Sequence, residues 1–202
     1  STRPGAKRIS VTEEIQRVIP SIINFKKNDL GVKVSLDTRN LSTMKLGHEN
    51  GVDIINDISG FINGNKIKFV SKFKLPLILM HMQNEPHNMQ TEPKYNFAPI
   101  DIYKILSKRV NELIQMGIEK SNIVVDPGIG FGKDLNHNLE ILRNITLFHS
   151  LGVAILIGVS RKSLIGEITR KGYERKGINK RLISPTKRLS GSLAFAMHSY
   201  NN

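Results

Sequence analysis

Residues 123–133 read Ile-Val-Val-Asp-Pro-Gly-Ile-Gly-Phe-Gly-Lys, an apolar run that ends in an acid and continues into a glycine-rich loop. The apolar run predicts a parallel strand covered on both faces. Asp126 then lies at the carboxyl end of that strand, where parallel α/β sheets bind their ligands. The stretch is not a Walker phosphate loop, because Pro127 and Asp134 stand where that loop needs Gly and Ser or Thr. We interpret it as a ligand site, in which glycines let the backbone approach a flat ligand closely. The alternative is a flexible loop in which Asp126 caps a nearby backbone group.

Similar apolar runs recur along the whole chain and alternate with helical patterns. Residues 10–13, Ser-Val-Thr-Glu, form a capping-box pattern before the first helix. The predicted strands are 32–37, 53–59, 76–82, 123–129 and 153–159, and the predicted helices between and after them are about 40–50, 62–73, 99–117, 136–149, 162–170 and 186–200. Short strands that alternate with helices predict βαβ units and a parallel sheet.

Polar residues at the strand ends favour a barrel over a doubly wound sheet. Each of the five predicted strands ends in a polar group: Asp37, Asn56-Asp57, His81, Asp126 and Ser160-Arg161-Lys162. That pattern is typical of the active-site face of a (β/α)8 barrel, whereas a doubly wound sheet gathers its ligand groups at one switch point. A full barrel needs eight strands. The sequence therefore predicts an incomplete (β/α)8 TIM barrel that occupies residues 1–202 as a single, partial domain.

Composition excludes several classes of protein. The chain has 202 residues and no cysteine, which excludes disulfide scaffolds, thiolate metal sites and a cysteine nucleophile. The absence of cysteine also agrees with a cytoplasmic location. The longest apolar run, 153–159, is far shorter than the roughly 20 residues that span a membrane, so no membrane partner is expected.

The chain is strongly basic, with 30 Lys and Arg against 17 Asp and Glu, a formal charge of +13. A polyanionic partner and A/T-rich coding are the two explanations, and the abundance of Ile and Asn beside Lys favours coding. Residues 161–188 hold ten basic and two acidic residues. We expect a solvated basic loop over about 167–187, because Tyr173 is its only aromatic residue and nucleic-acid platforms use several.

The individual motifs leave alternatives open. Asn56 is either a ligand group or a structural amide, because a buried amide must find partners. Asp37 either binds a ligand or caps the next helix. A packed histidine is favoured at His81 over a metal ligand or a general base. Lys162 could face anionic or carbonyl oxygens.

Together these blocks resemble the dihydropteroate synthase family, and residues 81–96 resemble its gammaproteobacterial-like branch. The resemblance rests on eight blocks in order: STRPGA (1–6), EEIQRVIP (13–20), VSLDT (34–38), IINDISG (54–60), LILMHMQ (77–83), DPGIGFGKDLNHN (126–138), GVSRKSLIG (158–166) and RLSGSLA (188–194). It implies a transferase of folate biosynthesis, a sulfonamide target. The reaction joins 6-hydroxymethyl-7,8-dihydropterin diphosphate to 4-aminobenzoate, gives 7,8-dihydropteroate and pyrophosphate, and uses Mg²⁺.

The same resemblance implies the site residues. Pterin-binding groups would be Asp37, Asn56, Asp126 and Lys162, with Met80 and Phe131 as walls of the pterin slot. Thr2, Arg3 and Ser160 would lie near the aminobenzoate and the diphosphate, and Lys162, Asp126 and Arg3 would be catalytic. The full-length form would be a homodimer with small-molecule substrates and no nucleic-acid partner.

Three departures from the family pattern accompany the resemblance. We expect the first strand with its Asn metal ligand, the second strand, and the final Arg-x-His strand to lie outside these residues. No metal ligand is then expected within this chain, and the anion half of the site would be largely absent. The alternatives are an inactive fragment or decayed relative and, more remotely, a basic nucleic-acid-binding module.

Overall fold

The computed structural model describes residues 9–83, 89, 91–179 and 181–202. Within these ranges five short strands form one sheet: β1 (Ser35–Asp37), β2 (Ile54–Asp57), β3 (Leu77–Met80), β4 (Ile123–Asp126) and β5 (Ala154–Ile155). Neighbouring strands are all parallel, and their spatial order is β1-β2-β3-β4-β5. A doubly wound sheet would reverse this order at its switch point. The sequential order is that of a barrel wall, so the prediction of an incomplete barrel is confirmed.

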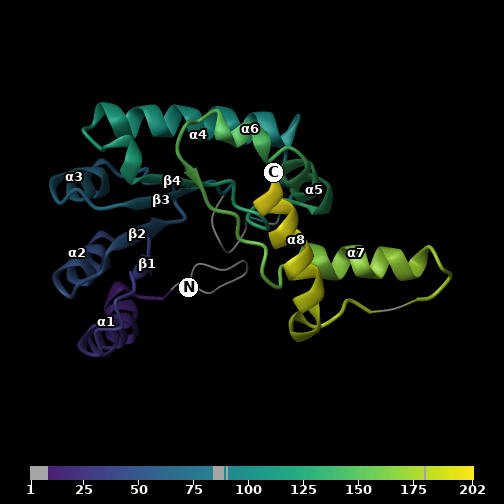
Figure 1. The fold of residues 1–202 in the computed structure, drawn as a ribbon, viewed down its shortest axis with the longest axis horizontal. Helices are drawn as coiled ribbons and strands as arrows, with labels where there is room; N and C mark the ends of the chain where they lie inside the picture. Colours follow the sequence, from purple (N-terminus) through teal and green to yellow (C-terminus); the bar gives the residue numbers. More distant parts are fainter. Residues whose placement is uncertain (1–8, 84–88, 90, 180) are drawn as a thin grey trace.

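Helices alternate with the strands, beginning with one before β1, and lie around the outside of the sheet, except that α7 extends away from it (Figure 1). They are α1 (Val11–Lys27), α2 (Leu41–Glu49), α3 (Gly64–Lys72), α4 (Ala98–Gln115), α5 (Leu135–Arg143), α6 (Thr146–His149), α7 (Ser163–Glu174) and α8 (Leu189–Asn201), with 3-10 turns η1 (Lys120–Asn122) and η2 (Pro185–Arg188). No helix in the described ranges is long and apolar enough to cross a membrane.

The two faces of the sheet have different environments. Side chains on one face pack against the helices in a single apolar core, and they include Leu36, Ile55, Leu77, Leu79 and Val125. Because side chains alternate along a strand, the intervening residues point to the other face, which is the inside of the barrel wall. Several of these residues are half-buried or exposed, among them Ser35, Asp37, Asn56 and Val124. The apolar face therefore fixes which strand residues face inward.

Several predicted boundaries were wrong. Each strand is shorter than its apolar run, because only some residues of the run pair with a neighbouring strand. The helix predicted over 136–149 is two helices, since α5 ends at Arg143 with Asn144 as its C-cap and α6 begins at Thr146. The basic loop predicted over 167–187 is also shorter, because α7 continues to Glu174 and η2 begins at Pro185.

Helix α1 is held over the loop that follows β1. The Ser10 half of the predicted capping box is present, since Ser10 Oγ accepts a hydrogen bond from the Glu13 N–H at 3.1 Å, while the Glu13 carboxylate pairs with Arg17. One turn later, the Glu14 carboxylate accepts hydrogen bonds from Thr38, Thr43 and Asn40. These contacts tie the first helix to the end of β1, next to Asp37.

Asp57 anchors the turn after β2. Its side chain is fully buried, and it accepts hydrogen bonds from the Ser59 N–H and hydroxyl at 2.9 and 2.6 Å and from the Phe61 N–H at 3.2 Å. Lys66 Nζ of α3 lies 2.8 Å from it and is itself 7% exposed. Asp57 points away from Asn56 and is a structural group of the outer face.

Removal of the Lys66 ammonium should destabilise the fold strongly. Lys66→Met leaves the buried Asp57 charge without its ion-pair partner, and we expect a loss of about 3–5 kcal/mol in the free energy of unfolding. Urea unfolding measures this loss. The matched control is Lys68→Met in the same helix, an exposed position where a change within about 0.5 kcal/mol is expected. Equal effects of the two substitutions would contradict the structural role of the pair.

Candidate active site

The inner face of the sheet gathers polar groups at the carboxyl ends of the strands. Asp37 of β1 is in register with Asn56 of β2. On the next pair, Met80 of β3 is in register with Asp126 of β4. Asn56 is in register with Ile78, two residues before Met80, so all four side chains lie on the same face. Asp37, Asn56, Met80 and Asp126 therefore share the inner face of the sheet, at the carboxyl ends of four successive strands.

Asn56 carries a polar atom without a partner. Its Oδ1 is buried and is the one such side-chain atom among the described residues that makes no hydrogen bond. Buried polar groups are normally paired, because an unpaired one costs roughly 1–3 kcal/mol. The orphaned oxygen points to a ligand donor rather than to a structural partner within the protein. This favours the site interpretation of Asn56 over the structural one.

Asp126 is the buried acid of the site. It is 8% exposed, and its Oδ1 accepts a hydrogen bond from the Gly128 N–H at 2.7 Å. Burial raises the pKa of Asp126, while this N–H and the nearby Lys162 and Lys133 ammonium groups act in the opposite direction. Asp126 therefore caps its own turn and also lines the inner face, and its role as a ligand group stays a prediction.

Lys162 reaches across from the loop after β5. Its Nζ donates a hydrogen bond to the Ile129 carbonyl oxygen at 2.6 Å and lies 4.2 Å from the centre of the Phe131 ring. Burial lowers the pKa of Lys162, and the negative charge of Asp126 opposes that shift. The structure therefore joins Asp126, Phe131 and Lys162 in one group, as predicted.

The glycines of the loop are required by packing against the segment after β3. Gly128 and Gly132 have φ of +72° and +60°. A Cβ on Gly128 would lie 2.0 Å from the His81 carbonyl oxygen, and one on Gly132 would lie 2.7 Å from the Gln83 carbonyl oxygen. The close approach that the sequence assigned to a flat ligand is thus made, at these two positions, by the neighbouring loop.

Lys133 is a site residue to which the sequence analysis gave no role. It is 3% exposed, and its Nζ donates to the Phe131 carbonyl oxygen at 2.8 Å and lies 3.1 Å from His81 Nδ1. His81 is packed, as predicted, and its burial and the Lys133 charge lower its pKa well below the usual value. The sequence shows only a lysine at the end of a glycine loop, and its burial depends on His81 in the segment after β3.

Two other predicted residues lie at the surface. Ser160 is exposed in the loop between β5 and α7, and Asp37 is exposed at the end of β1. Thr2 and Arg3 lie outside the described residues. In the described part of the chain, no three His, Asp or Glu side chains are grouped closely enough to hold a metal ion.

Comparison with known proteins gives one consistent answer. The family profile described as pterin binding enzyme matches residues 1–202. Dihydropteroate synthase of Escherichia coli K12 is 37% identical over 197 residues, which are 98% of this chain and 65% of that protein. The enzyme of Haemophilus influenzae is 37% identical over 176 residues, 87% of this chain and 64% of that protein. The chain therefore spans about 65% of the length of these curated relatives.

Solved structures agree with the family resemblance. Dihydropteroate synthase of Yersinia pestis in complex with a sulfonamide drug has a TM-score of 0.88 at 32% identity, and the match covers 99% of this chain and 68% of that one. The Xanthomonas albilineans enzyme with 4-aminobenzoic acid has a TM-score of 0.87 at 31% identity, covering 100% and 67%. Both the fold and the resemblance stated from the sequence are confirmed.

Lys133 should make stability depend on pH. Burial lowers its pKa from 10.5 to about 7, so the folded chain releases this proton at a lower pH than the unfolded chain. Between these values the unfolded state binds more protons, and the free energy of unfolding should rise with pH, at up to about 1.4 kcal/mol per pH unit.

Urea unfolding between pH 7 and 10 measures this contribution as the difference between wild type and Lys133→Met. We expect the difference to grow with pH, because the variant lacks the titrating group. Lys45→Met, at an exposed position of α2, is the control and should leave the slope unchanged. A pH-independent difference for Lys133→Met would show that its amine titrates alike in both states.

Proposed function

The chain belongs to the pterin-binding enzyme family, and on that basis we propose that it forms the pterin-binding part of a dihydropteroate synthase. The reaction would join 6-hydroxymethyl-7,8-dihydropterin diphosphate to 4-aminobenzoate, with release of pyrophosphate. The observation that carries this proposal is the unpaired Asn56 Oδ1 on the same face as the buried Asp126. A pterin is a flat ring with hydrogen-bond donors and acceptors along its edge, and such a ring would satisfy both groups.

Each polar side chain has a role in this proposal. The Asp126 carboxylate accepts hydrogen bonds from the amino group and a ring N–H of the pterin, a charge-assisted pair. Asn56 donates and accepts along the same edge. Lys162 faces the carbonyl and N5 side of the ring from its position over Phe131. Met80 and Phe131 supply apolar walls, and Asp37 extends the polar edge.

The chemistry needs little from acid–base residues. The bond between the pterin methylene carbon and the diphosphate oxygen breaks, and pyrophosphate leaves with the electron pair. The aniline nitrogen of 4-aminobenzoate forms the new C–N bond and then loses a proton to water. An aniline nitrogen is nucleophilic without a base, so the chain needs binding groups and cations more than a general base.

Other features of the function remain predictions. Mg²⁺ would stabilise the departing pyrophosphate when bound, and its ligands are predicted outside this chain. Arg3, Thr2 and Ser160 are proposed to lie near the aminobenzoate and the diphosphate. A homodimer, a cytoplasmic location and the absence of a nucleic-acid partner are also proposed. An inactive relative with the same fold is the alternative to an active enzyme.

The nucleic-acid alternative gains no support from the basic segment. Lys162 lies over Phe131 in the site, Arg170 pairs with Glu174, and the Arg188 guanidinium is buried against backbone carbonyls. These three cations of residues 161–188 have partners within the protein. Any RNA affinity should therefore be weak and strongly dependent on salt.

Replacement of the buried acid tests the pterin site. Asp126→Asn keeps the shape of the side chain but removes the charge, and we expect affinity for 6-hydroxymethyl-7,8-dihydropterin to fall by about 10- to 100-fold, or about 1.5–3 kcal/mol. Calorimetry with the 202-residue chain measures the dissociation constant. The control is Asp134→Asn at the exposed cap of α5. An unchanged dissociation constant for Asp126→Asn would place the pterin elsewhere.

Catalysis by the chain alone should be undetectable. The groups that meet the leaving pyrophosphate in the family are predicted outside these residues, and each missing oxyanion donor commonly costs about 10²–10³ in rate. The test assays pyrophosphate release with both substrates and Mg²⁺, beside a longer chain that carries the family's remaining strands. Comparable turnover of the two proteins would refute the proposed division of the site.

A further inference from the structure

Arg161 has a strained backbone between two proposed site residues. Its φ is +54°, in the left-handed region that is unfavourable for residues other than glycine. Ser160 precedes Arg161, and Lys162 follows it as the N-cap residue of α7. A strained conformation persists only where the surrounding structure holds it, and such positions cluster at functional sites. The contacts that hold Arg161 therefore bear on the position of Lys162.

Two buried residues at the start of α8 hold both backbone groups of Arg161. Its N–H donates a hydrogen bond to Ser192 Oγ at 2.8 Å, and its carbonyl oxygen accepts one from Arg188 Nη1 at 3.0 Å. Ser192 Oγ also donates to the Arg188 carbonyl oxygen at 2.7 Å, which links the two residues. Each is 7% exposed. We call Arg188 and Ser192 the α8 clamp.

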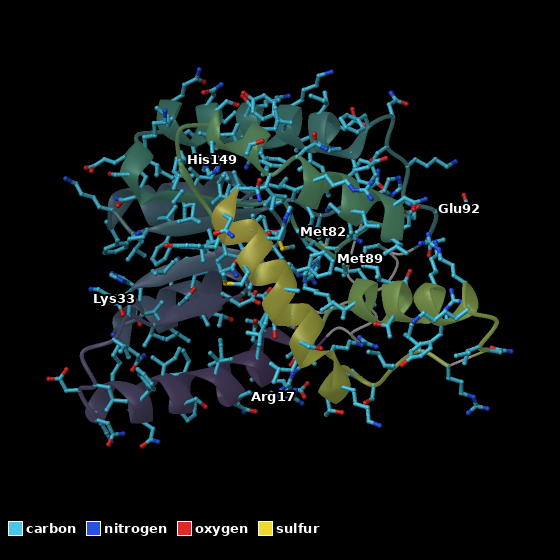
Figure 2. The ribbon with its side chains drawn as sticks, turned by 45° about the vertical axis from the view of Figure 1, so that its right-hand side comes forward. Arg17, Lys33, Met82, Met89, Glu92 and His149 are labelled. Atoms are coloured by element: carbon cyan, nitrogen blue, oxygen red, sulfur yellow. The ribbon has the colours of Figure 1, made fainter. Side chains whose placement is uncertain are left out.

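The same guanidinium also fixes the end of the basic segment. Arg188 Nε and Nη2 donate to the Ile183 carbonyl oxygen at 3.0 and 2.8 Å. Gly166 of α7 leaves room for this arrangement, because a Cβ there would lie 3.1 Å from Arg188 Nε. The Arg188 guanidinium thus links the loop after β5 to the loop before η2, and it packs against α7. Figure 2 shows α8 (yellow) at the front of the molecule in that view, and Figure 1 shows that it lies beside α5 and α7.

We propose that the α8 clamp positions Lys162 for pterin binding by holding Arg161 in its strained conformation. Lys162 follows Arg161 directly, and its N–H faces the Val159 carbonyl oxygen at 3.4 Å, a long contact that alone would hold the turn weakly. The hydrogen bonds from Ser192 and Arg188 to the Arg161 backbone are shorter, and they hold the other side of the same turn. The proposal rests on the proposed function for the identity of the ligand, but the placement of the Lys162 amine over Phe131 can be tested without any ligand.

The ligand-free test uses NMR of the chain labelled with ¹³C at lysine Cε. The Lys162 signal should be shifted by the Phe131 ring current, because Nζ lies 4.2 Å from the ring centre. Its loss in Lys162→Arg assigns it. We expect Ser192→Ala and Arg188→Met to move this signal towards the ordinary lysine position. Ser199→Ala is the matched control, since Ser199 Oγ bonds to the Phe195 carbonyl oxygen at 2.8 Å in the same helix.

The second test measures affinity for 6-hydroxymethyl-7,8-dihydropterin by calorimetry. Ser192→Ala should weaken binding about threefold to tenfold, the effect of one hydrogen bond, while Ser199→Ala should not. The same pair of substitutions is then made in Lys162→Met. If the clamp acts through Lys162, Ser192→Ala has no further effect in that background.

The two tests separate the clamp from the proposed function. An unmoved Lys162 signal in Ser192→Ala overturns the clamp, even if Arg188→Met proves too unstable to measure. Equal weakening of pterin binding by Ser192→Ala with and without Lys162 also overturns it, because the effect would then be structural. If the wild-type chain does not bind the pterin, the proposed function fails, and the NMR signal still decides whether α8 positions Lys162.

Discussion

Parallel pairing of short strands in a fixed register is the constraint on which the site depends. The helices bury Leu36, Ile55, Leu79 and Val125 on one face, and a shift of register by one residue would turn these side chains towards the inside. With the apolar face fixed, the residues between them must point inward. The polar edge of the site is therefore a consequence of how the core packs, and it needs no separate folding signal.

Cations that donate to backbone carbonyls hold the loops at this end of the sheet. Arg109 donates to the carbonyl oxygens of the turn after β2, Lys133 to those after β3 and β4, and Lys162 and Arg188 to those of the glycine loop and the loop after β5. Hydrogen bonds from charged donors are stronger than neutral ones, and they fix loops that have few apolar contacts. Some of the excess basic residues therefore stabilise loops inside the protein. This role is a third explanation of the positive charge, beside a polyanionic partner and coding bias.

The sequence predicted what depends on local pattern and failed where distant segments meet. Apolar runs and their polar ends predicted five strands and placed Asn56 and Asp126 at the carboxyl ends of their strands. The role of Lys133 could not be predicted, because it depends on the approach of the segment after β3. Arg188 was equally hidden, since its partner Arg161 lies 27 residues away and its guanidinium is buried only once α7 and α8 pack. The length of each strand also depends on how many of its residues pair with the neighbouring strand, which the local sequence does not show.

The glycine loop shows that a structural and a functional interpretation of one motif need not compete. Gly128 and Gly132 are required because the loop packs against the His81 and Gln83 carbonyl oxygens, and a side chain at either position would push the two loops apart. The same close packing buries Asp126 beside Lys133 and removes both from water. Burial then strengthens the interaction of the acid with any ligand donor, because the local dielectric constant falls. The tight packing of the loop is thus what would make the Asp126 carboxylate a strong acceptor for the proposed ligand, and loosening the loop should weaken the proposed binding even with every polar residue in place.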